Sequence, residues 1–516
     1  MMQRLLFCAA ALLALPVHAL DGDIAVHDPS TVILHAGRYY TYGTGKGLPI
    51  LTSDDGWTWQ RRGSLMSSLP GGKPGPDVLA RGGDNSWAPD IIHIGDKFFV
   101  YYSAPGTQPK SAIGLLVGRT LDPDSPDYRW EDGGPVVWSD GVEDSNAIDP
   151  GVLLGPDGKL WLTYGSYFGY IRLVELDPKT GKRLYPNKPA LNIAINSEAS
   201  ILTYRDGWYY LLVTHGSCCQ GANSTYNIRM GRSRKVTGPY LDNMGIDMIE
   251  GGGKLFAASR GRHIGPGHFG LLDLGEDVQK FSLHYEADLD RGGISVLDIR
   301  PLLWSEGWPV AGDNLAPGTY TLESVRTGTV LELAVQGSPV GGMRPRRGGP
   351  PGSGIAGSAP GNAPPGAIPS GAPPWEPRPG PAIPDQESIQ VATSWPATTS
   401  VRLAPAMLQA QQKWTLTPAP NAGCTPGAPC FRISIAGTER SLTATAGGEL
   451  AVAPFTGAAE QLWRIDQLTD GSYRISPKSA PGSNTPPALS AVGSSMPTLA
   501  KFDPSSDRQR WLLRTP

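Results

Sequence analysis

The chain has 516 residues, a formal net charge of -3 and 18% charged residues. This length exceeds one ordinary hydrophobic core, so two domains joined by linkers are expected. The balanced charge, without a long basic run, argues against nucleic acid or an anionic membrane as a partner and suits a neutral polymer.

The first nineteen residues have the pattern of a secretory signal peptide. Arg4 precedes an apolar run from Leu5 to Pro16, and residues 17–19 form a small-residue cleavage pattern. The run is too short to span a membrane, and no later stretch approaches the required length of about twenty residues. We therefore expect a secreted protein, extracellular or periplasmic, that is matured after Ala19.

Five similar strand-like segments recur between residues 24 and 310. Alternating runs such as 97–102 and 159–164 indicate strands. A period of about forty to fifty residues with several short strands per unit is typical of β-propeller blades. We predict an all-β chain with a five-bladed propeller over residues 20–310. The five segments open on HDPS (27–30), WAPD (87–90), AIDPG (147–151), SEAS (197–200) and GPGH (265–268).

Acidic residues stand near the start of four of these segments. Asp28, Asp90 and Asp149 occupy similar places in the first three, and Glu198 does so in the fourth. The start of each innermost strand faces the propeller axis, so these carboxylates can converge. Inverting hydrolysis of a glycosidic bond needs a base and an acid roughly 6.5 to 9.5 Å apart. A third carboxylate can raise the pKa of the acid.

A second domain is expected over residues 311–516. From Gly337 to about residue 385 the chain is almost wholly Gly, Pro, Ala and Ser. Such a segment cannot bury enough apolar surface to order itself, and we predict a disordered loop inserted within this domain.

A second repeat lies in the same domain. Gln-x-Trp recurs at 412–414, 461–463 and 509–511, with spacings of 49 and 48 residues. Three such units predict a β-trefoil in which each Trp packs in the core and each Gln bonds nearby backbone groups.

Four cysteines remain once Cys8 leaves with the signal peptide. Cys424 and Cys430 flank a short turn and are expected to form a disulfide in an oxidising compartment. The adjacent Cys218 and Cys219 leave two alternatives, a pair of free thiols or a strained ring disulfide.

The five segment openings, together with THGSCCQGANSTYNIRMGRS (214–233), resemble glycoside hydrolase family 43, the five-bladed arabinanases and arabinofuranosidases. The similarity spans about residues 24 to 300, and segment 214–233 is similar to a subgroup acting on α-1,5-linked arabinan. The resemblance implies that Asp28 is the general base and Glu198 the general acid. It also implies that Asp149 raises the pKa of the acid and orients it.

Further site residues follow from the same resemblance. Trp87 would stack on a sugar, and His268 would be the main protein contact of a largely water-coordinated calcium or other hard cation in the channel. His27 would orient Asp28 or the sugar. Additional pocket contacts are expected from Asp90, Asn146, Ser166 and His215.

The Gln-x-Trp blocks resemble ricin-type lectin modules, which hold sugar with an Asp and an aromatic residue. Here the first halves of the repeats carry no Asp. Phe455 and Phe502 could stack on a sugar in the second and third repeats, whereas the first repeat has Ala406 near the corresponding position. Sugar binding and a structural role both remain open for this domain.

The sequence thus predicts a secreted, monomeric, inverting hydrolase of α-1,5-L-arabinofuranosyl linkages, without an organic cofactor. Its substrate would be arabinan or a related pectic or hemicellulosic polysaccharide. One alternative is an exo-acting α-L-arabinofuranosidase or β-xylosidase on the same scaffold. Another is a non-catalytic polysaccharide-binding protein.

Overall fold

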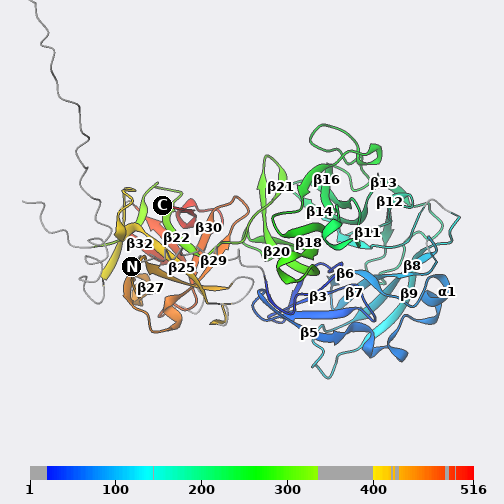
Figure 1. Cartoon of the computed structure of the whole chain (residues 1–516), viewed down its shortest axis with the longest axis horizontal. Coiled ribbons are helices and arrows are strands. Elements are labelled where there is room, and N and C mark those ends of the chain that lie inside the picture. Colours follow the sequence, from blue (N-terminus) through cyan, green and yellow to red (C-terminus); the bar gives the residue numbers. More distant parts are fainter. Residues whose placement is uncertain are drawn as a thin grey trace, which may run out of the picture.

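The computed structural model describes residues 20–107, 109–142, 145–334, 399–419, 422–424, 429–482, 487–493 and 496–516. The predicted signal peptide and the Gly/Pro-rich insertion fall outside the described residues. Strands dominate the described part of the chain, whose one α-helix is α1 (Pro76–Arg81). No helix within it is long and apolar enough to cross a membrane. Figure 1 shows the propeller and a separate C-terminal β domain beside it.

Five antiparallel sheets follow one another along the chain and form the predicted five blades. Blade one also carries β1 (Asp21–Gly22), which pairs in parallel with β5. From the inner to the outer strand, the blades contain β2 (Ile33–His35), β3 (Arg38–Tyr42), β4 (Pro49–Ser53) and β5 (Thr58–Ser64); β6 (Trp87–Ile94), β7 (Lys97–Pro105), β8 (Ser111–Gly118) and β9 (Trp130–Ser139); β10 (Gly151–Leu154), β11 (Leu160–Tyr164), β12 (Tyr170–Leu176) and β13 (Leu191–Ile195); β14 (Glu198–Arg205), β15 (Trp208–His215), β16 (Asn227–Ser233) and β17 (Lys254–Ala257); and β18 (His263–Asp273), β19 (Gln279–Asp288), β20 (Ile294–Ser305) and β21 (Trp308–Ala311).

The hydrophobic core of the propeller lies between neighbouring blades. One cluster joins Tyr40 and Ile50 of blade one to Val100 and Leu116 of blade two, and another joins blade two to blade three. Each blade therefore buries both faces, which explains why strands such as β7 are apolar on successive residues instead of on alternate ones.

The ring is closed by the start of the chain. The Val26 N–H donates to Ser295 O at 3.1 Å, and the Leu297 N–H donates to Ile24 O at 2.9 Å. These bonds attach the segment before blade one to β20 of blade five, so first and last blades are joined by main-chain pairing.

Each of the five segment openings contains one non-glycine residue with a positive φ. These residues are Asp28 (47°), Ala88 (41°), Asp149 (56°), Ala199 (49°) and His268 (60°). This repeat corrects the predicted register. Asp28 and Asp149 are equivalent, but Glu198 lies one residue before its equivalent position and Asp90 two residues after.

Side chains from a neighbouring blade hold these left-handed turns. The N–H groups of Asp28, Ala88, Asp149 and His268 donate to His284 Nδ1, Thr44 Oγ1, Ser103 Oγ and Thr214 Oγ1 at 2.9, 2.8, 2.8 and 3.0 Å. A positive φ in a non-glycine residue persists where its surroundings over-determine it. The same contacts that hold the turn therefore fix the direction of each side chain at the axis.

Asp90 connects three blades. It is buried, and its Oδ1 and Oδ2 accept the main-chain N–H groups of Thr31 and Val152 at 3.1 and 2.9 Å. Both carboxylate oxygens thus bond backbone groups, which gives Asp90 a structural role, and the sugar contact expected at this position stays a prediction.

The C-terminal domain contains one ten-stranded sheet that pairs back on itself, and a hairpin. Its short 3-10 turns include η6 (Ala410–Gln412), η9 (Ala459–Gln461) and η10 (Asp507–Gln509). The strands are β22 (Gly318–Ser324), β23 (Val330–Leu333), β24 (Thr399–Ala404), β25 (Trp414–Ala419), β26 (Cys430–Ile435), β27 (Arg440–Ala444), β28 (Leu450–Pro454), β29 (Leu462–Gln467), β30 (Tyr473–Pro477), β31 (Ala488–Val492), β32 (Met496–Ala500) and β33 (Trp511–Arg514).

The three Gln-x-Trp units make the same contacts. Trp414, Trp463 and Trp511 are fully buried, and each indole N–H donates at 2.9 Å to a leucine main-chain oxygen, of Leu331, Leu442 and Leu489 respectively. Each Gln also bonds backbone groups, as when Gln461 accepts from Thr456 N and donates to Pro454 O. The predicted roles of Trp and Gln are confirmed, and the trefoil topology stays a prediction.

The C-terminal domain rests on blade five. The Thr469 N–H donates to Asp277 O and the Trp304 N–H donates to Thr469 O, both at 2.8 Å. The predicted Cys424–Cys430 disulfide is present in this domain. Guanidinium groups stack on the two candidate sugar platforms, Arg432 on Phe455 at 4.4 Å and Arg474 on Phe502 at 4.7 Å. Each guanidinium covers one face of its ring, and the role of both rings stays a prediction.

We predict that Asp90→Asn lowers the free energy of unfolding by about 1–3 kcal/mol, because one buried main-chain N–H loses its acceptor. Denaturant unfolding measures this change. The matched control is Asp96→Asn, which removes one exposed ion pair with Arg119 in the same blade and should have little effect. Equal stability of the two variants would contradict the structural role of Asp90.

Candidate active site

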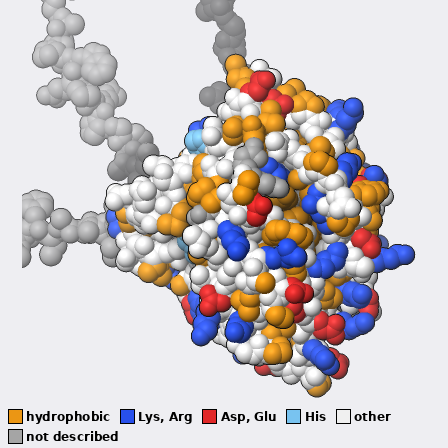
Figure 2. All heavy atoms as spheres, turned by 90° about the vertical axis from the view of Figure 1, so that its right-hand side faces the viewer, with side chains coloured by type: hydrophobic (Ala, Val, Ile, Leu, Met, Phe, Trp, Pro, Cys, Tyr) orange, Lys and Arg blue, Asp and Glu red, His pale blue; other side chains and the backbone are white. Residues whose placement is uncertain are grey.

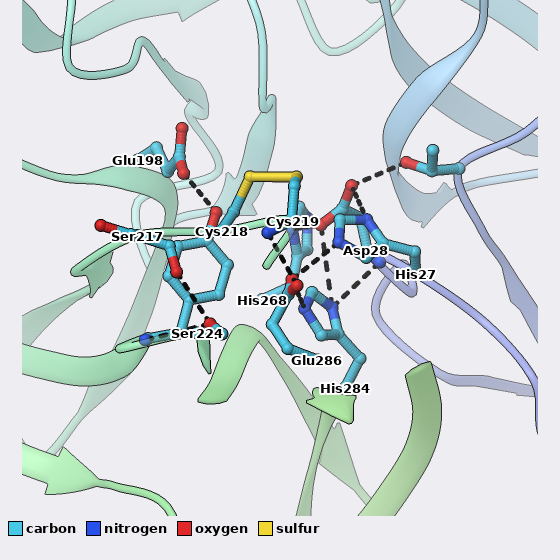
Figure 3. The surroundings of a disulfide bond; sticks show 12 residues. His27, Asp28, Glu198, Ser217, Cys218, Cys219, Ser224, His268, His284 and Glu286 are labelled. Carbon is cyan, nitrogen blue, oxygen red and sulfur yellow. Dashed lines mark hydrogen bonds and ion pairs between the residues drawn. A yellow bond between two sulfur atoms is a disulfide. The ribbon is translucent and has the colours of Figure 1, made fainter. Parts of the chain in front are cut away.

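The three predicted catalytic carboxyl groups meet at the axis, where the inner strands of blades one, three and four begin. The negative charge of Asp28 contributes to the raised pKa values of both Asp149 and Glu198, so the three groups share one electrostatic environment. Figure 3 shows Asp28 and Glu198 on either side of the Cys218–Cys219 disulfide.

Asp28 is held as a carboxylate. Its Oδ2 accepts from Thr44 Oγ1 at 2.7 Å and from His27 Nδ1 at 2.8 Å. Burial opposes the charge, but His27 and His268 outweigh it and hold the pKa of Asp28 well below its usual range. The group is therefore ionised at neutral pH and can act as a base.

A histidine–glutamate network supports Asp28. His27 contacts Asp28 through Nδ1 and Glu286 Oε1 through Nε2, the latter at 2.7 Å. Both partners are acceptors, so His27 must carry protons on both nitrogens. Burial works against this charge, but Asp28 and Glu286 raise the pKa of His27 to about 11.

His284 has the opposite protonation state. Its Nδ1 accepts the Asp28 N–H at 2.9 Å and therefore carries no proton, which leaves Nε2 to donate to Glu286 Oε1 at 3.1 Å. Burial and the nearby His27 charge lower the pKa of His284. The ring stacks on His27 with centroids 4.5 Å apart. A neutral imidazole thus orients Asp28, and a charged one stabilises its carboxylate.

Glu198 lies in a different environment. Burial and the charge of Asp28 raise its pKa, while a hydrogen bond from the Tyr226 hydroxyl to Oε1 opposes the rise. The net pKa is raised, so Glu198 keeps a proton to higher pH than an exposed glutamic acid. This suits it to donate a proton.

Asp149 is joined to the segment that carries Glu198. Its Oδ2 accepts the Ala199 N–H at 3.2 Å, one residue after Glu198. Burial, followed by the Glu198 charge, raises the pKa of Asp149 well above its usual range. Asp149 is therefore placed to orient Glu198, and both carboxyl groups have a raised pKa.

The adjacent Cys218 and Cys219 form a disulfide, which decides between the two alternatives left open by the sequence. They lie in the loop between β15 and β16, before η3 (Gly221–Asn223). The Cys219 N–H donates to Glu286 Oε2 at 2.8 Å. The loop is thereby tied to the carboxylate that holds His27.

His268 has the character expected of a cation ligand. It is buried, and its Nδ1 lies 3.3 Å from Asp28 Oδ1 without hydrogen-bond geometry to any described residue. An unsatisfied imidazole nitrogen fits a hard cation whose other ligands are water oxygens. His27, His284 and Glu286 also form a cluster with metal-ligand spacing, but their nitrogens already bond Glu286, so this cluster does not need an ion.

The remaining predicted contacts occupy different positions. Asn146 and Ser166 are buried and joined to each other, Nδ2 to Oγ at 3.4 Å. Trp87 is half-buried at the start of β6, one residue before the left-handed Ala88. His215 is half-buried at the end of β15, and burial lowers its pKa.

Three residues of the site were not found from the sequence. His284 and Glu286 alternate on β19, and Tyr226 immediately precedes β16. Polar and apolar residues alternate through FSLHYEAD (281–288), and this was a usable signal, because alternate residues share one face of a strand. Tyr226 carried no comparable signal.

A five-bladed propeller that pairs an ionised carboxylate with a carboxyl of raised pKa at its axis defines a glycoside hydrolase. The sequence model of glycosyl hydrolases family 43 matches residues 22–309, which is more than half of the chain. The chain therefore belongs to glycosyl hydrolase family 43.

Several characterised proteins are similar over the same region. An extracellular endo-α-(1→5)-L-arabinanase of Bacillus subtilis is 36% identical over 294 residues, covering 55% of this chain and 87% of the relative. An extracellular exo-α-(1→5)-L-arabinofuranosidase of Cellvibrio japonicus is 33% identical, covering 58% and 90%. The solved structure of a Cellvibrio cellulosa α-L-arabinanase with arabinohexaose is 31% identical, with a TM-score of 0.52 and coverage of 56% and 95%.

We predict that Tyr226→Phe raises the pKa of Glu198. The hydroxyl stabilises the ionised carboxylate, so its removal leaves the effects of burial and the Asp28 charge less opposed. Carboxyl ¹³C NMR measures the titration. Tyr167→Phe is the matched control, because that hydroxyl donates to Thr214 O at 3.4 Å. A lower pKa of Glu198 in Tyr226→Phe would refute the assigned hydrogen bond.

Proposed function

We propose that this protein is an inverting arabinan endo-1,5-α-L-arabinosidase. The observation that carries the proposal is the opposite perturbation of two carboxyl groups in one buried cluster, with the pKa of Asp28 lowered and that of Glu198 raised. The similarity to endo- and exo-acting arabinan hydrolases supports arabinan as the substrate.

Asp28 and Glu198 divide the chemistry. The Asp28 carboxylate takes a proton from a water molecule as that water attacks the anomeric carbon of an arabinofuranosyl unit. Glu198 gives its proton to the departing glycosidic oxygen on the other side of the sugar. This arrangement inverts the anomeric configuration, because the water enters opposite to the leaving group.

Asp149 and the imidazoles prepare these two groups. Asp149 orients Glu198 through the Ala199 N–H, and the ionised Asp28 contributes the negative charge that raises the pKa of Glu198. The charged His27 keeps Asp28 ionised, and the neutral His284 fixes its main chain. Trp87 supplies a face on which a sugar ring can stack.

A calcium or similar hard cation belongs to the proposal. His268 would hold it through Nδ1, which has no hydrogen bond of good geometry and lies 3.3 Å from Asp28 Oδ1. The cation would supply positive charge near Asp28 and so favour its carboxylate form.

Secretion is also proposed. The relatives of Bacillus subtilis and Cellvibrio japonicus are named as extracellular proteins, and a polymer outside the cell is accessible only to an exported enzyme. We keep the proposal that the C-terminal domain is a ricin-type β-trefoil with a structural role, which its three matching Gln-x-Trp units support.

The second candidate function is exo-action on the same scaffold, as an α-L-arabinofuranosidase. The exo-acting relative of Cellvibrio japonicus favours it. Timed digestion of linear arabinan separates the two candidates. Early oligomers mean endo-action, whereas arabinose as the sole product means exo-action. Xylan in a parallel digestion tests the β-xylosidase alternative.

We predict that Glu198→Gln lowers turnover of arabinan by about 10²- to 10⁴-fold, because the leaving oxygen loses its proton donor. An aryl arabinofuranoside with an acidic phenol should be affected far less, since its leaving group needs no protonation. Glu250→Gln, at an exposed position of the same blade, is the matched control. Unchanged turnover of arabinan by Glu198→Gln would refute the mechanism, and binding without hydrolysis by the wild-type protein would leave only a binding function.

A further inference from the structure

A cavity of about 650 Å³ lies between the outer strands of blades two and three, apart from the carboxyl cluster at the axis. Its walls are the end of β9, the strands β12 and β13, and the connection 182–190 between them. Its volume is in the range of small-ligand sites. Figure 2 shows the side of the molecule on which blades two and three lie, where Lys and Arg side chains stand beside exposed hydrophobic ones.

The cavity wall is cationic. Lys182, Arg183 and Lys188 line it together with Arg172, and no Asp or Glu is among the described lining residues. Lys182 Nζ donates to the main-chain oxygen of Pro135 at 2.7 Å, and the Arg183 guanidinium donates to that of Lys188. These bonds to main-chain oxygens orient the Lys182 and Arg183 side chains.

One of these cations retains an unused donor. Arg183 Nε is buried and has no hydrogen-bond partner among the described residues. Buried polar groups are nearly always satisfied, by protein, water or a ligand. A carboxylate is the acceptor that a guanidinium binds most strongly, since two parallel N–H groups match its two oxygens.

An aromatic ring stands at the same cavity. Trp138 is 48% exposed, and it is one of the lining residues. The Arg81 guanidinium stacks on its ring at 3.7 Å and holds it in place. A rigid, exposed indole beside polar Asn187 and Asn192 suits the flat apolar face of a sugar ring, as in other sites with one apolar surface and a few polar groups.

We propose that this cavity binds carboxylate-bearing sugar units, that is, hexuronic acids. Trp138 would stack on the ring, and Arg183 and Lys188 would bind the carboxylate. This inference rests on the proposed function, because it assumes that the acidic sugar belongs to the same polysaccharide whose neutral part enters the catalytic site. The cavity suits an acidic sugar because its lining carries four cationic side chains, which attract a carboxylate.

Titration calorimetry on the full chain with Glu198→Gln, which prevents turnover, tests the proposal with trigalacturonic acid as the probe. We expect saturable binding that weakens as salt is added. Arg183→Gln and Lys188→Gln should each lower the affinity by about tenfold. Lys179→Gln, an exposed lysine of the same blade outside the cavity, is the matched control and should bind as the parent does.

Trp138→Ala and inorganic phosphate distinguish a sugar site from a general anion site. Trp138→Ala should weaken trigalacturonate binding and leave phosphate binding unchanged, because phosphate has no ring to stack. Equal affinities for the two anions, or undiminished trigalacturonate binding in the Arg183→Gln/Lys188→Gln double variant, would overturn the proposal. Unchanged unfolding midpoints verify that each variant is folded.

Hydrolysis of neutral linear arabinan is measured separately. For this assay Arg183→Gln, Lys188→Gln and Trp138→Ala are each placed in the enzyme that retains Glu198, and the rate of hydrolysis should be unchanged. If the unsubstituted protein does not hydrolyse arabinan, the proposed function is refuted and the binding result still stands. Absence of trigalacturonate binding in an enzyme that cleaves arabinan would refute the cavity proposal alone.

Discussion

The site depends on a hydrogen bond that recurs around the propeller, from the N–H of a left-handed residue to a side chain of the neighbouring blade. In blade one this acceptor is His284 Nδ1, and in blade three it is Ser103 Oγ. Because each such bond crosses between blades, the direction of a catalytic side chain is set by the packing of two blades and not by its own strand. The carboxyl groups can therefore lie about 170 positions apart in the chain and still hold one arrangement.

The opposite behaviour of Asp28 and Glu198 comes from their neighbours. Both are half-buried, and this burial acts to raise the pKa of both. Asp28 has a doubly protonated imidazole and a hydroxyl as partners, so its pKa is lowered and the carboxylate form is favoured. Glu198 has one phenol and a nearby negative charge, so protonation is favoured. One pocket thus contains a base and an acid at the same pH, which is the general requirement for two-carboxylate hydrolysis.

Much of this was accessible from the sequence, because each blade begins with a local motif. The five openings predicted the propeller and the residues Asp28, Asp149 and Glu198. The register within the openings was wrong by one or two residues, since the left-handed turn that defines it has no fixed residue type and is occupied by Asp, Ala and His. Asp90, two residues after the left-handed position, bonds main-chain N–H groups of both neighbouring blades.

Other parts could not be predicted, because they arise from contacts between blades. His284, Glu286 and Tyr226 come from second and third strands, whose neighbours are set by the closed ring. The state of Cys218 and Cys219 depends on the loop that holds them, and spacing alone left it undecided. In the C-terminal domain, by contrast, the Gln-x-Trp repeat predicted its contacts correctly, since donor and acceptor there lie within one repeated unit.

Blade five carries His268, His284 and Glu286, and it is also the blade to which both flanking parts of the chain attach. The segment before blade one pairs with β20, and the C-terminal domain bonds to Asp277 and Trp304. The support of the catalytic carboxylate is therefore also the anchor of the whole architecture. Local unfolding of blade five, started from either attached segment, should abolish activity before the other four blades unfold. Loss of activity on heating should therefore precede loss of structure.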